Sequence, residues 1–181
     1  QALRAVERER FVPEEYREES YRDGPLPIGG NQTISQPYIV AYMTDLLDLS
    51  GEEKVLELGT GSGYQAAILC EMAREVYSVE IMEELYEGSR HLLLGELGYE
   101  NLYLKLGDGR EGWPEFQPYD RILLTAAPTR VPTVLFEQLG IGGILVAPVG
   151  NFIQNIKWYQ KTEIDQITQK DLIGVSFVPF R

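Results

Sequence analysis

The sequence contains a single cysteine, Cys70, and a single histidine, His91. One cysteine excludes an internal disulfide and is typical of a reducing compartment, so we expect a cytoplasmic protein. With so few sulfur and imidazole groups, a metal site would depend on carboxylates. No acidic stretch has the spacing of a calcium loop, and we expect no metal.

Long apolar runs and positive charge are also scarce. No run approaches the roughly 20 residues that span a bilayer, and the first twenty residues are too charged for a signal peptide. Lys and Arg total 16 against 28 Asp and Glu, which gives a net charge of −12. Because nucleic-acid binding needs clustered cations and none is present, we expect neither a nucleic-acid nor a membrane partner.

The chain of 181 residues, 44% of them hydrophobic, is long enough for one α/β domain and short for two. We expect a single domain over residues 1–181. Within it we distinguish an N-terminal helical and substrate-cleft region (1–50), a cofactor-binding core (51–150) and C-terminal strands (151–181).

Strand and helix patterns alternate through the core. We expect strands at 54–59, 75–80, 101–109, 119–127 and 142–150, and helices at 64–74, 82–98 and 132–139. Such alternation predicts a mostly parallel sheet with helices on both faces. Two further strands, 155–162 and 171–180, have no helix between them and predict an antiparallel C-terminal edge. Upstream we expect a surface helix at 2–10, a loop at 23–31 and a helix from 37 to about 49.

A glycine-rich loop, Gly59-Thr60-Gly61-Ser62-Gly63, follows the first core strand. Its G-x-G-x-G spacing differs from the dinucleotide fingerprint, and no Lys-Ser/Thr follows to hold a triphosphate. Glu57, two residues before Gly59, would repel a pyrophosphate. It suits a cationic ligand that carries an ammonium and a sulfonium, which is S-adenosylmethionine.

Two more carboxylates follow later strands. Glu80 ends the second core strand, where an acid commonly binds both ribose hydroxyls, although NAD has the same ribose. Asp108 follows the third strand and could accept from the adenine amino group. Each acid alone could equally cap a helix or face water. Three acids at successive strand ends around a glycine turn favour a nucleoside-type cofactor.

The segment "GNQTISQPYIVAYM", residues 30–43, allows two interpretations. Ser35 or Gln36 could simply cap a helix that begins near Pro37, where proline is well tolerated. A helix N-terminus is also a site for anions, through its free N–H groups and its dipole. Ser35 could therefore both cap the helix and donate its hydroxyl to a substrate carboxylate.

Several segments together resemble one family. They are "FVPEEYREESYRDGPLPIGGNQTISQPYIVAYMTDLL", "VLELGTGSGYQAAIL", "VYSVE", "GDGREGWPEFQPYDRILLTAAPTRVPTVLFEQLGIGGILVAPVG" and "VSFVPF". Over nearly its whole length the chain resembles the protein-L-isoaspartate (D-aspartate) O-methyltransferase family. The glycine loop is common to many methyltransferases, whereas "TISQP" combined with the "TAAP" to "PVG" stretch is far more specific. The family usually continues upstream of residue 1 with more helix.

The resemblance implies a Rossmann-like S-adenosylmethionine-dependent methyltransferase fold and a role in protein repair. The implied reaction methylates the free α-carboxylate of L-isoaspartyl residues, and of D-aspartyl residues, in damaged proteins, and leaves S-adenosylhomocysteine. The ester then recloses to a succinimide, which can open to normal aspartate. The implied substrate is an isoaspartyl polypeptide, and we expect a monomer.

The resemblance also assigns residues. Ser35 takes the catalytic position. The implied substrate-binding residues are Thr33, Ile34, Gln36, Pro37, Tyr38 and Val149. The implied cofactor-binding residues are Glu57, Gly59, Thr60, Gly61, Gly63, Gln65, Glu80, Ile81, Asp108, Gly109 and Thr125.

The chemistry of a carboxylate acceptor agrees with these assignments. A carboxylate has a reference pKa of about 4 and is already ionised at neutral pH, so it needs positioning and no base. His91 lies in the middle of an expected helix, where we expect a surface or packing residue. Four alternatives remain: an S-adenosylmethionine-dependent methyltransferase that acts on a small molecule, a nucleic-acid methyltransferase, a hydride-transferring NAD enzyme, and a cofactor-binding module without turnover. Glu57 before the loop and the spacing of the glycines argue against the NAD enzyme. The nucleic-acid enzyme would be expected to show a basic face and an Asn/Asp-Pro-Pro-aromatic motif, and neither is present.

Overall fold

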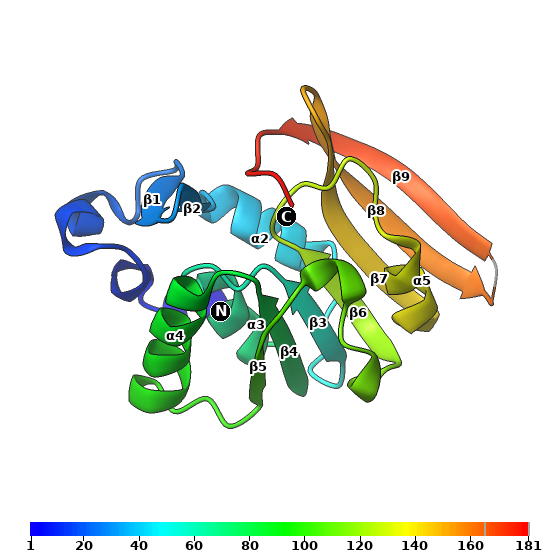
Figure 1. The fold of residues 1–181 in the computed structure, drawn as a ribbon, viewed down its shortest axis with the longest axis horizontal. Helices are drawn as coiled ribbons and strands as arrows, with labels where there is room; N and C mark the ends of the chain where they lie inside the picture. The colour runs from blue at the N-terminus through cyan, green and yellow to red at the C-terminus, as the bar shows by residue number, and fades with distance from the viewer. Residues whose placement is uncertain (165, 181) are drawn as a thin grey trace.

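The computed structural model describes residues 1–164 and 166–180. Its centre is a seven-stranded sheet of order β5-β4-β3-β6-β7-β8-β9 (Figure 1). The strands are β3 (Lys54–Leu58), β4 (Glu75–Glu80), β5 (Leu102–Leu106), β6 (Tyr119–Leu124), β7 (Leu139–Gly150), β8 (Gln154–Glu163) and β9 (Gln166–Val175). Strands β5, β4, β3, β6 and β7 are parallel, and β8 and β9 add antiparallel pairings. The predicted mostly parallel sheet with an antiparallel C-terminal edge is confirmed.

Helices cover both faces of this sheet, as predicted. One face packs against α2 (Pro37–Asp45), α3 (Tyr64–Cys70) and the helix α4 (Glu83–Arg90), which continues as a π-helical segment, η3 (His91–Glu96). The other face packs against α5 (Thr133–Gln138) and the region of two 3₁₀ turns, η4 (Gly109–Glu111) and η5 (Pro114–Phe116). Because side chains alternate along a strand, Val55 enters the first core and Leu56 the second. Within residues 1–164 and 166–180, no helix is long and apolar enough to cross a membrane.

The N-terminal region differs from its prediction. The prediction of one surface helix over 2–10 is wrong. The structure has a short helix, α1 (Ala2–Ala5), and a 3₁₀ helix, η1 (Arg8–Phe11), which are separated by two extended residues, Val6 and Glu7. Val6, Arg8 and Phe11 are buried, so this segment is part of the core. A further 3₁₀ helix, η2 (Glu14–Glu19), follows.

The loop expected at 23–31 contains the start of a hairpin, formed by β1 (Leu26–Gly29) and β2 (Gln32–Ile34). Gly29, Gly30 and Asn31 make its turn with positive φ angles of 93°, 56° and 57°. Two glycines and an asparagine adopt such angles with little strain, so "GGN" was a turn signal between two short strands.

The boundaries of two further elements differ from those predicted. The helix from Pro37 ends at Asp45 and not near 49, and Asp48 follows with a φ of 50°. The strand expected at 171–180 runs over Gln166–Val175 instead, and residues 176–180 leave the sheet. β9 is an edge strand with mostly exposed side chains, so its first half lacks the hydrophobic alternation that would reveal it.

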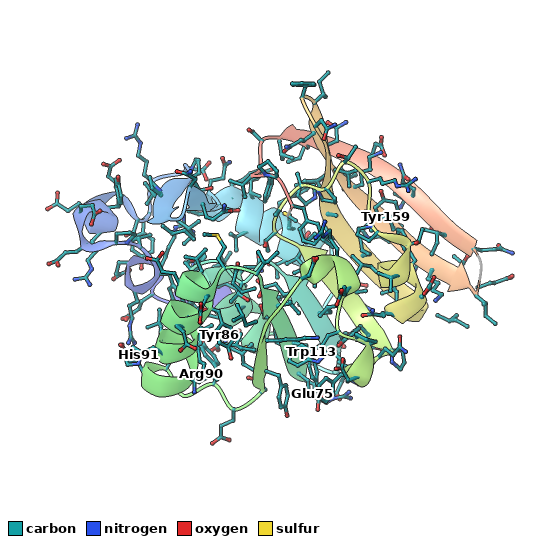
Figure 2. The ribbon with its side chains drawn as sticks, in the orientation of Figure 1. Glu75, Tyr86, Arg90, His91, Trp113 and Tyr159 are labelled. Carbon is teal, nitrogen blue, oxygen red and sulfur yellow. The ribbon has the colours of Figure 1, made fainter. Side chains whose placement is uncertain are left out.

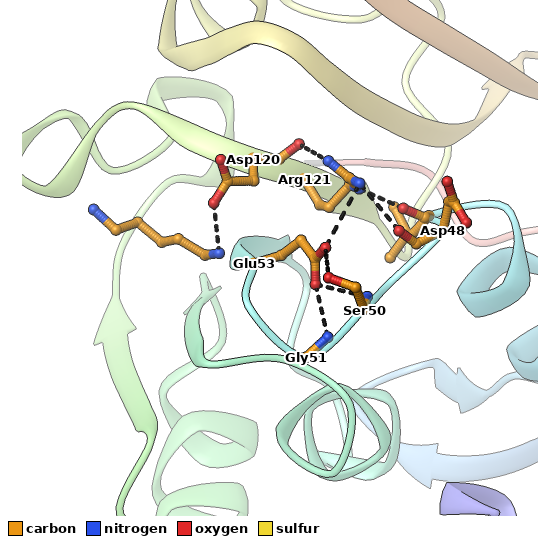
Figure 3. Close-up of polar contacts among 8 residues, drawn as sticks. Asp48, Ser50, Gly51, Glu53, Asp120 and Arg121 are labelled. Carbon is orange, nitrogen blue, oxygen red and sulfur yellow. Dashed lines mark hydrogen bonds and ion pairs between the residues drawn. The ribbon is translucent and has the colours of Figure 1, made fainter.

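A polar cluster at the amino end of the sheet holds α2 in place (Figure 3). Arg121 on β6 donates to the carbonyl oxygen of Leu47 and, at 3.0 Å, to that of Asp48. The carboxylate of Glu53 accepts from the backbone N–H of Ser50 at 2.9 Å and lies 3.8 Å from the Arg121 guanidinium. These bonds satisfy two carbonyls of the segment that follows α2 and connect that segment to the central strands.

Candidate functional site

A cavity opens at the carboxyl ends of β3 and β4, where ligands bind in doubly wound folds. Its walls come from the glycine loop, from the segment between β2 and α2, and from residues 177–179 of the C-terminal segment, which returns beside α2 (Figure 1). Of the residues that the sequence assigned, it is lined by Thr33, Ile34, Ser35, Gly59, Thr60, Gly61, Gln65, Glu80, Ile81 and Thr125.

The glycine loop exposes its backbone to this cavity. Gly59 and Gly61 have positive φ angles of 102° and 56°, which favour glycine. A Cβ atom on Gly59 would collide with the hydroxyl of Thr125. That hydroxyl, on the residue after β6, lies within hydrogen-bond distance of the carbonyl oxygens of Leu58 and Gly59, so it holds the start of the loop directly.

Glu80 presents a fixed carboxylate at the cavity wall. The side chain is buried, Oε2 accepts from the backbone N–H of Gly61 at 2.8 Å, and Oε1 accepts from that of Met82 at 2.9 Å. A carboxylate offers about four acceptor sites, so two remain after these bonds. The arrangement can accept hydrogen bonds from a pair of ligand hydroxyls.

Glu57 does not face the cavity, contrary to the prediction from the sequence. It projects from β3 onto the same face as Val55, opposite Ser78 on β4, and its side chain is fully buried. Ser78 donates to Oε2, and Thr60 Oγ1 lies 2.6 Å from the Ser78 hydroxyl. Oε1 has no hydrogen-bond partner among the described residues.

The protonation state of Glu57 follows from this burial. Loss of solvent raises the pKa of Glu57 to about 8; the hydrogen bond from Ser78 opposes the rise and the charge of Glu80 adds to it. At neutral pH the carboxyl group therefore keeps its proton. As a neutral group, Glu57 is linked to the loop through Ser78 and Thr60, and it supplies no negative charge to a cationic ligand.

Three other residues that were assigned to the cofactor also lie outside the cavity lining. The carboxylate of Asp108 is taken up by Arg110, whose Nη2 lies 2.6 Å from Oδ2, and this hydrogen bonding lowers the pKa of Asp108. A Cβ on Gly109 would lie 3.0 Å from the Phe180 ring, and one on Gly63 would lie 2.7 Å from a methyl carbon of Leu93. Both glycines are thus packing positions in this structure.

A second hollow adjoins the cavity. It is lined by residues before and at the start of α2, including Gln36 and Tyr38, and by the chain from 173 to 178. The two spaces share Thr33, Ser35, Ile39, Thr125, Phe177 and Val178. Ser35 therefore stands where they meet, whereas Pro37 and Val149 line neither.

The N-terminus of α2 is not capped as predicted. Gln36 is the N-cap residue, but its side chain makes no capping hydrogen bond. Asp23, fifteen residues upstream, accepts from the backbone N–H of Tyr38 at 3.2 Å instead. Because this carboxylate occupies the positive end of the helix, the hydroxyl of Ser35 is not needed as a cap.

The C-terminal segment was missed as part of the site. Phe177, Val178 and Pro179 line the cavity, although the sequence predicts a strand over 171–180. Gln154 holds this segment, because its Oε1 accepts from the N–H of Phe177 at 2.6 Å and its Nε2 donates to the Phe177 carbonyl at 3.1 Å. Ala127 donates to the Val178 carbonyl at 2.9 Å. The proline that ends the run was the available sign of a break.

His91 lies on the surface, as expected. Figure 2 shows it beside Arg90 at the end of α4. Its side chain is 77% exposed and its Nε2 lies 3.3 Å from Glu96 Oε1. Among the described residues, no three His, Cys, Asp or Glu side chains gather as metal ligands.

Sequence comparison gives the family. The sequence model of protein-L-isoaspartate (D-aspartate) O-methyltransferases matches residues 1–181. The chain belongs to this family. A protein-L-isoaspartate O-methyltransferase of Picosynechococcus sp. is 52% identical over 180 residues, which cover 99% of this chain and 80% of that relative. One from Dictyoglomus thermophilum is also 52% identical and is covered to 81%.

Solved structures agree with the methyltransferase family. A protein-L-isoaspartate O-methyltransferase structure has a TM-score of 0.90 at 29% identity; the match covers 98% of this chain and 59% of that one, so the chain spans less than two thirds of that protein. A Plasmodium falciparum structure named for the same activity, in complex with S-adenosyl-L-homocysteine, has a TM-score of 0.86 at 21% identity and is covered to 88%. These likenesses confirm the Rossmann-like methyltransferase fold.

Proposed function

We propose that this chain transfers a methyl group from S-adenosylmethionine to the free α-carboxylate of L-isoaspartyl residues in damaged polypeptides. Membership of the O-methyltransferase family supports the reaction class. The main observation in support of the proposal is that Thr33 and Ser35 line both the glycine-loop cavity and the second hollow. A donor in the first space and an acceptor in the second would meet at Ser35.

The residues around the first space fit the donor. Glu80 keeps acceptor capacity for ribose hydroxyls, and the positive φ angles of Gly59 and Gly61 allow a ligand to approach the backbone closely. S-adenosylmethionine, when bound, supplies a methyl group activated by a sulfonium. We assign its binding to Gly59, Thr60, Gly61, Gln65, Glu80, Ile81 and Thr125. Glu57, Gly63 and Gly109 would stabilise the residues of this wall without contacting the donor. Asp108 would bind the adenine after its ion pair with Arg110 breaks.

Ser35 has the role of positioning the acceptor. Its hydroxyl donates to one oxygen of the acceptor carboxylate, beside Thr33, while Gln36 and Tyr38 border the same hollow. The carboxylate is ionised at neutral pH, so the site has to hold it and need not deprotonate it. Because Asp23 occupies the α2 N-terminus, hydroxyl groups and not the helix end would hold this anion. The segment 177–179 excludes water from the junction, which favours a reaction in which opposite charges neutralise each other.

We further propose that residues 1–181 form one domain that works as a monomer in the cytoplasm. Its substrates are isoaspartyl polypeptides, with D-aspartyl residues as further substrates. The net charge of −12 supports the exclusion of nucleic acids, and the single buried cysteine supports a reducing compartment.

A pair of peptides tests the function. One peptide carries an L-isoaspartyl residue and the other carries normal aspartate at the same position. With S-adenosylmethionine present, the purified chain should form a base-labile methyl ester, 14 Da heavier by mass spectrometry, on the first peptide alone. Equal labelling of both peptides would refute the assignment.

A further inference from the structure

Arg8 is a buried cation that the proposed reaction does not use. Its side chain is completely buried, and its Nε donates to the carbonyl oxygen of Ser20 at 2.6 Å. Neither Nη1 nor Nη2 has a hydrogen-bond partner within residues 1–164 and 166–180. Burial lowers the pKa of Arg8, which reflects the cost of removing the charge from water. An apolar side chain of similar size would fill the same space at lower cost, so packing alone does not explain the arginine.

The guanidinium group lies over an aromatic ring. Its central carbon is 4.9 Å from the centroid of the Tyr64 ring, within the range of a cation–π interaction. Phe11, from the same 3₁₀ helix as Arg8, contacts that ring edge-on, with centroids 5.4 Å apart. Two residues of η1 thus fix the orientation of Tyr64.

Tyr64 links this cluster to the cavity. It is the first residue of α3, it follows Gly63 directly, and it lines the glycine-loop cavity. Gly63 donates to the carbonyl of Thr60 at 2.9 Å and accepts from Ala67 at 2.9 Å, which joins the loop to the first turn of the helix. A shift of the Tyr64 ring would therefore change the wall formed by Gly61 to Tyr64.

We infer that Arg8 is a positioning residue for the methyl donor, because its contact with Tyr64 sets one wall of the glycine-loop cavity. The inference rests on the proposed function. Arg8 is absent from the cavity lining and acts through the tyrosine ring. This role can be told apart from a purely structural one. Substituting a residue that is needed only for folding would lower the free energy of unfolding, but the molecules that remain folded would bind the donor with unchanged affinity.

The test compares Arg8→Met with Val6→Ala. Methionine preserves an unbranched, buried side chain and removes the charge. Val6 is buried in the same segment, so its truncation is the matched control for lost packing. Affinity for S-adenosylhomocysteine is measured by calorimetry at a temperature where circular dichroism shows each variant fully folded. Arg8→Met should raise the Kd about tenfold and Val6→Ala less than twofold. The KM of Arg8→Met for an isoaspartyl peptide, at saturating donor, should stay within twofold.

Two further variants keep the test decisive if Arg8→Met fails to fold. Arg8→Lys keeps a cation over the ring and should hold the Kd within about threefold. Tyr64→Leu should raise the Kd about as much as Arg8→Met, and combining the two should add little, because both remove one interaction. An unchanged Kd in Arg8→Met or in Tyr64→Leu would overturn the inference. If the parent chain itself bound no S-adenosylhomocysteine, the proposed function would fail instead.

Discussion

The buried carboxyl group of Glu57 predicts how the stability of this protein depends on pH. Burial raises the pKa of Glu57 from 4.5 to about 8 in the folded protein. The folded state therefore keeps a proton that the unfolded chain releases above about pH 4.5. The stabilisation is fully present below that pH and is lost progressively as the pH rises to about 8. Each pH unit within the window costs about 1.4 kcal/mol, so the step from pH 5.5 to 7.5 costs about 3 kcal/mol.

Glu57→Gln removes this dependence, because the amide is neutral at every pH and has nearly the same shape. The free energy of unfolding is measured by urea denaturation at pH 5.5 and 7.5. Between these values the parent should lose about 3 kcal/mol more than the variant. Glu75→Gln, at a half-buried position on β4 (Figure 2), is the control for loss of one negative charge and should follow the parent. If the parent and Glu57→Gln lost stability in parallel, Glu57 would not be a protonated, buried group.

Three other substitutions have defined outcomes. Ser35→Ala removes a hydrogen bond to a charged acceptor, worth about 1.5–3 kcal/mol, so kcat/KM for an isoaspartyl peptide should fall about 10- to 100-fold. Its Kd for S-adenosylhomocysteine should change less than twofold; equal losses in both would place Ser35 in the donor site. Arg121→Met leaves the carbonyls of Leu47 and Asp48, which follow α2, without their donor and should lower the free energy of unfolding by about 1–3 kcal/mol in urea denaturation; an unchanged midpoint would show that these hydrogen bonds do not stabilise the fold. Gly59→Ala forces a Cβ onto Thr125 at a φ of 102° and should cost more than about 1 kcal/mol, while Gly24→Ala, with open space around it, should cost less.

The central strands of the sheet could be predicted because they are buried on both faces. Parallel strands such as β3 and β6 read as apolar runs separated by helices, which identifies both their existence and their direction. The same rule fails at β9, because an edge strand with exposed side chains has no such run. The turn at Gly29–Asn31 had a readable signal, whereas the short strands beside it did not.

The site was predictable where it rests on a local motif. Residues 59–62 of the glycine loop and Ser35, which belong to two local motifs, line one cavity. Contacts between segments far apart in the chain were not predictable: Asp23 caps α2 and Arg8 lies over Tyr64, yet no spacing rule connects either pair.

The prediction that Glu57 faces the cavity was wrong for a different reason. Alternation along β3 puts it on the same face as Val55, beneath α3, so the periodicity of the strand already contained the answer. The motif around the glycine loop suggested a cavity-facing acid, whereas the strand's own period indicated a buried one.

If a donor cavity and an acceptor hollow meet at Ser35, a crystal structure with both S-adenosylhomocysteine and an isoaspartyl peptide will show the two ligands side by side at this residue. We expect the donor product against Gly59 and Glu80 and the isoaspartyl α-carboxylate within hydrogen-bond distance of Ser35 Oγ. A carboxylate bound away from Ser35, with the donor product in its cavity, would contradict this expectation.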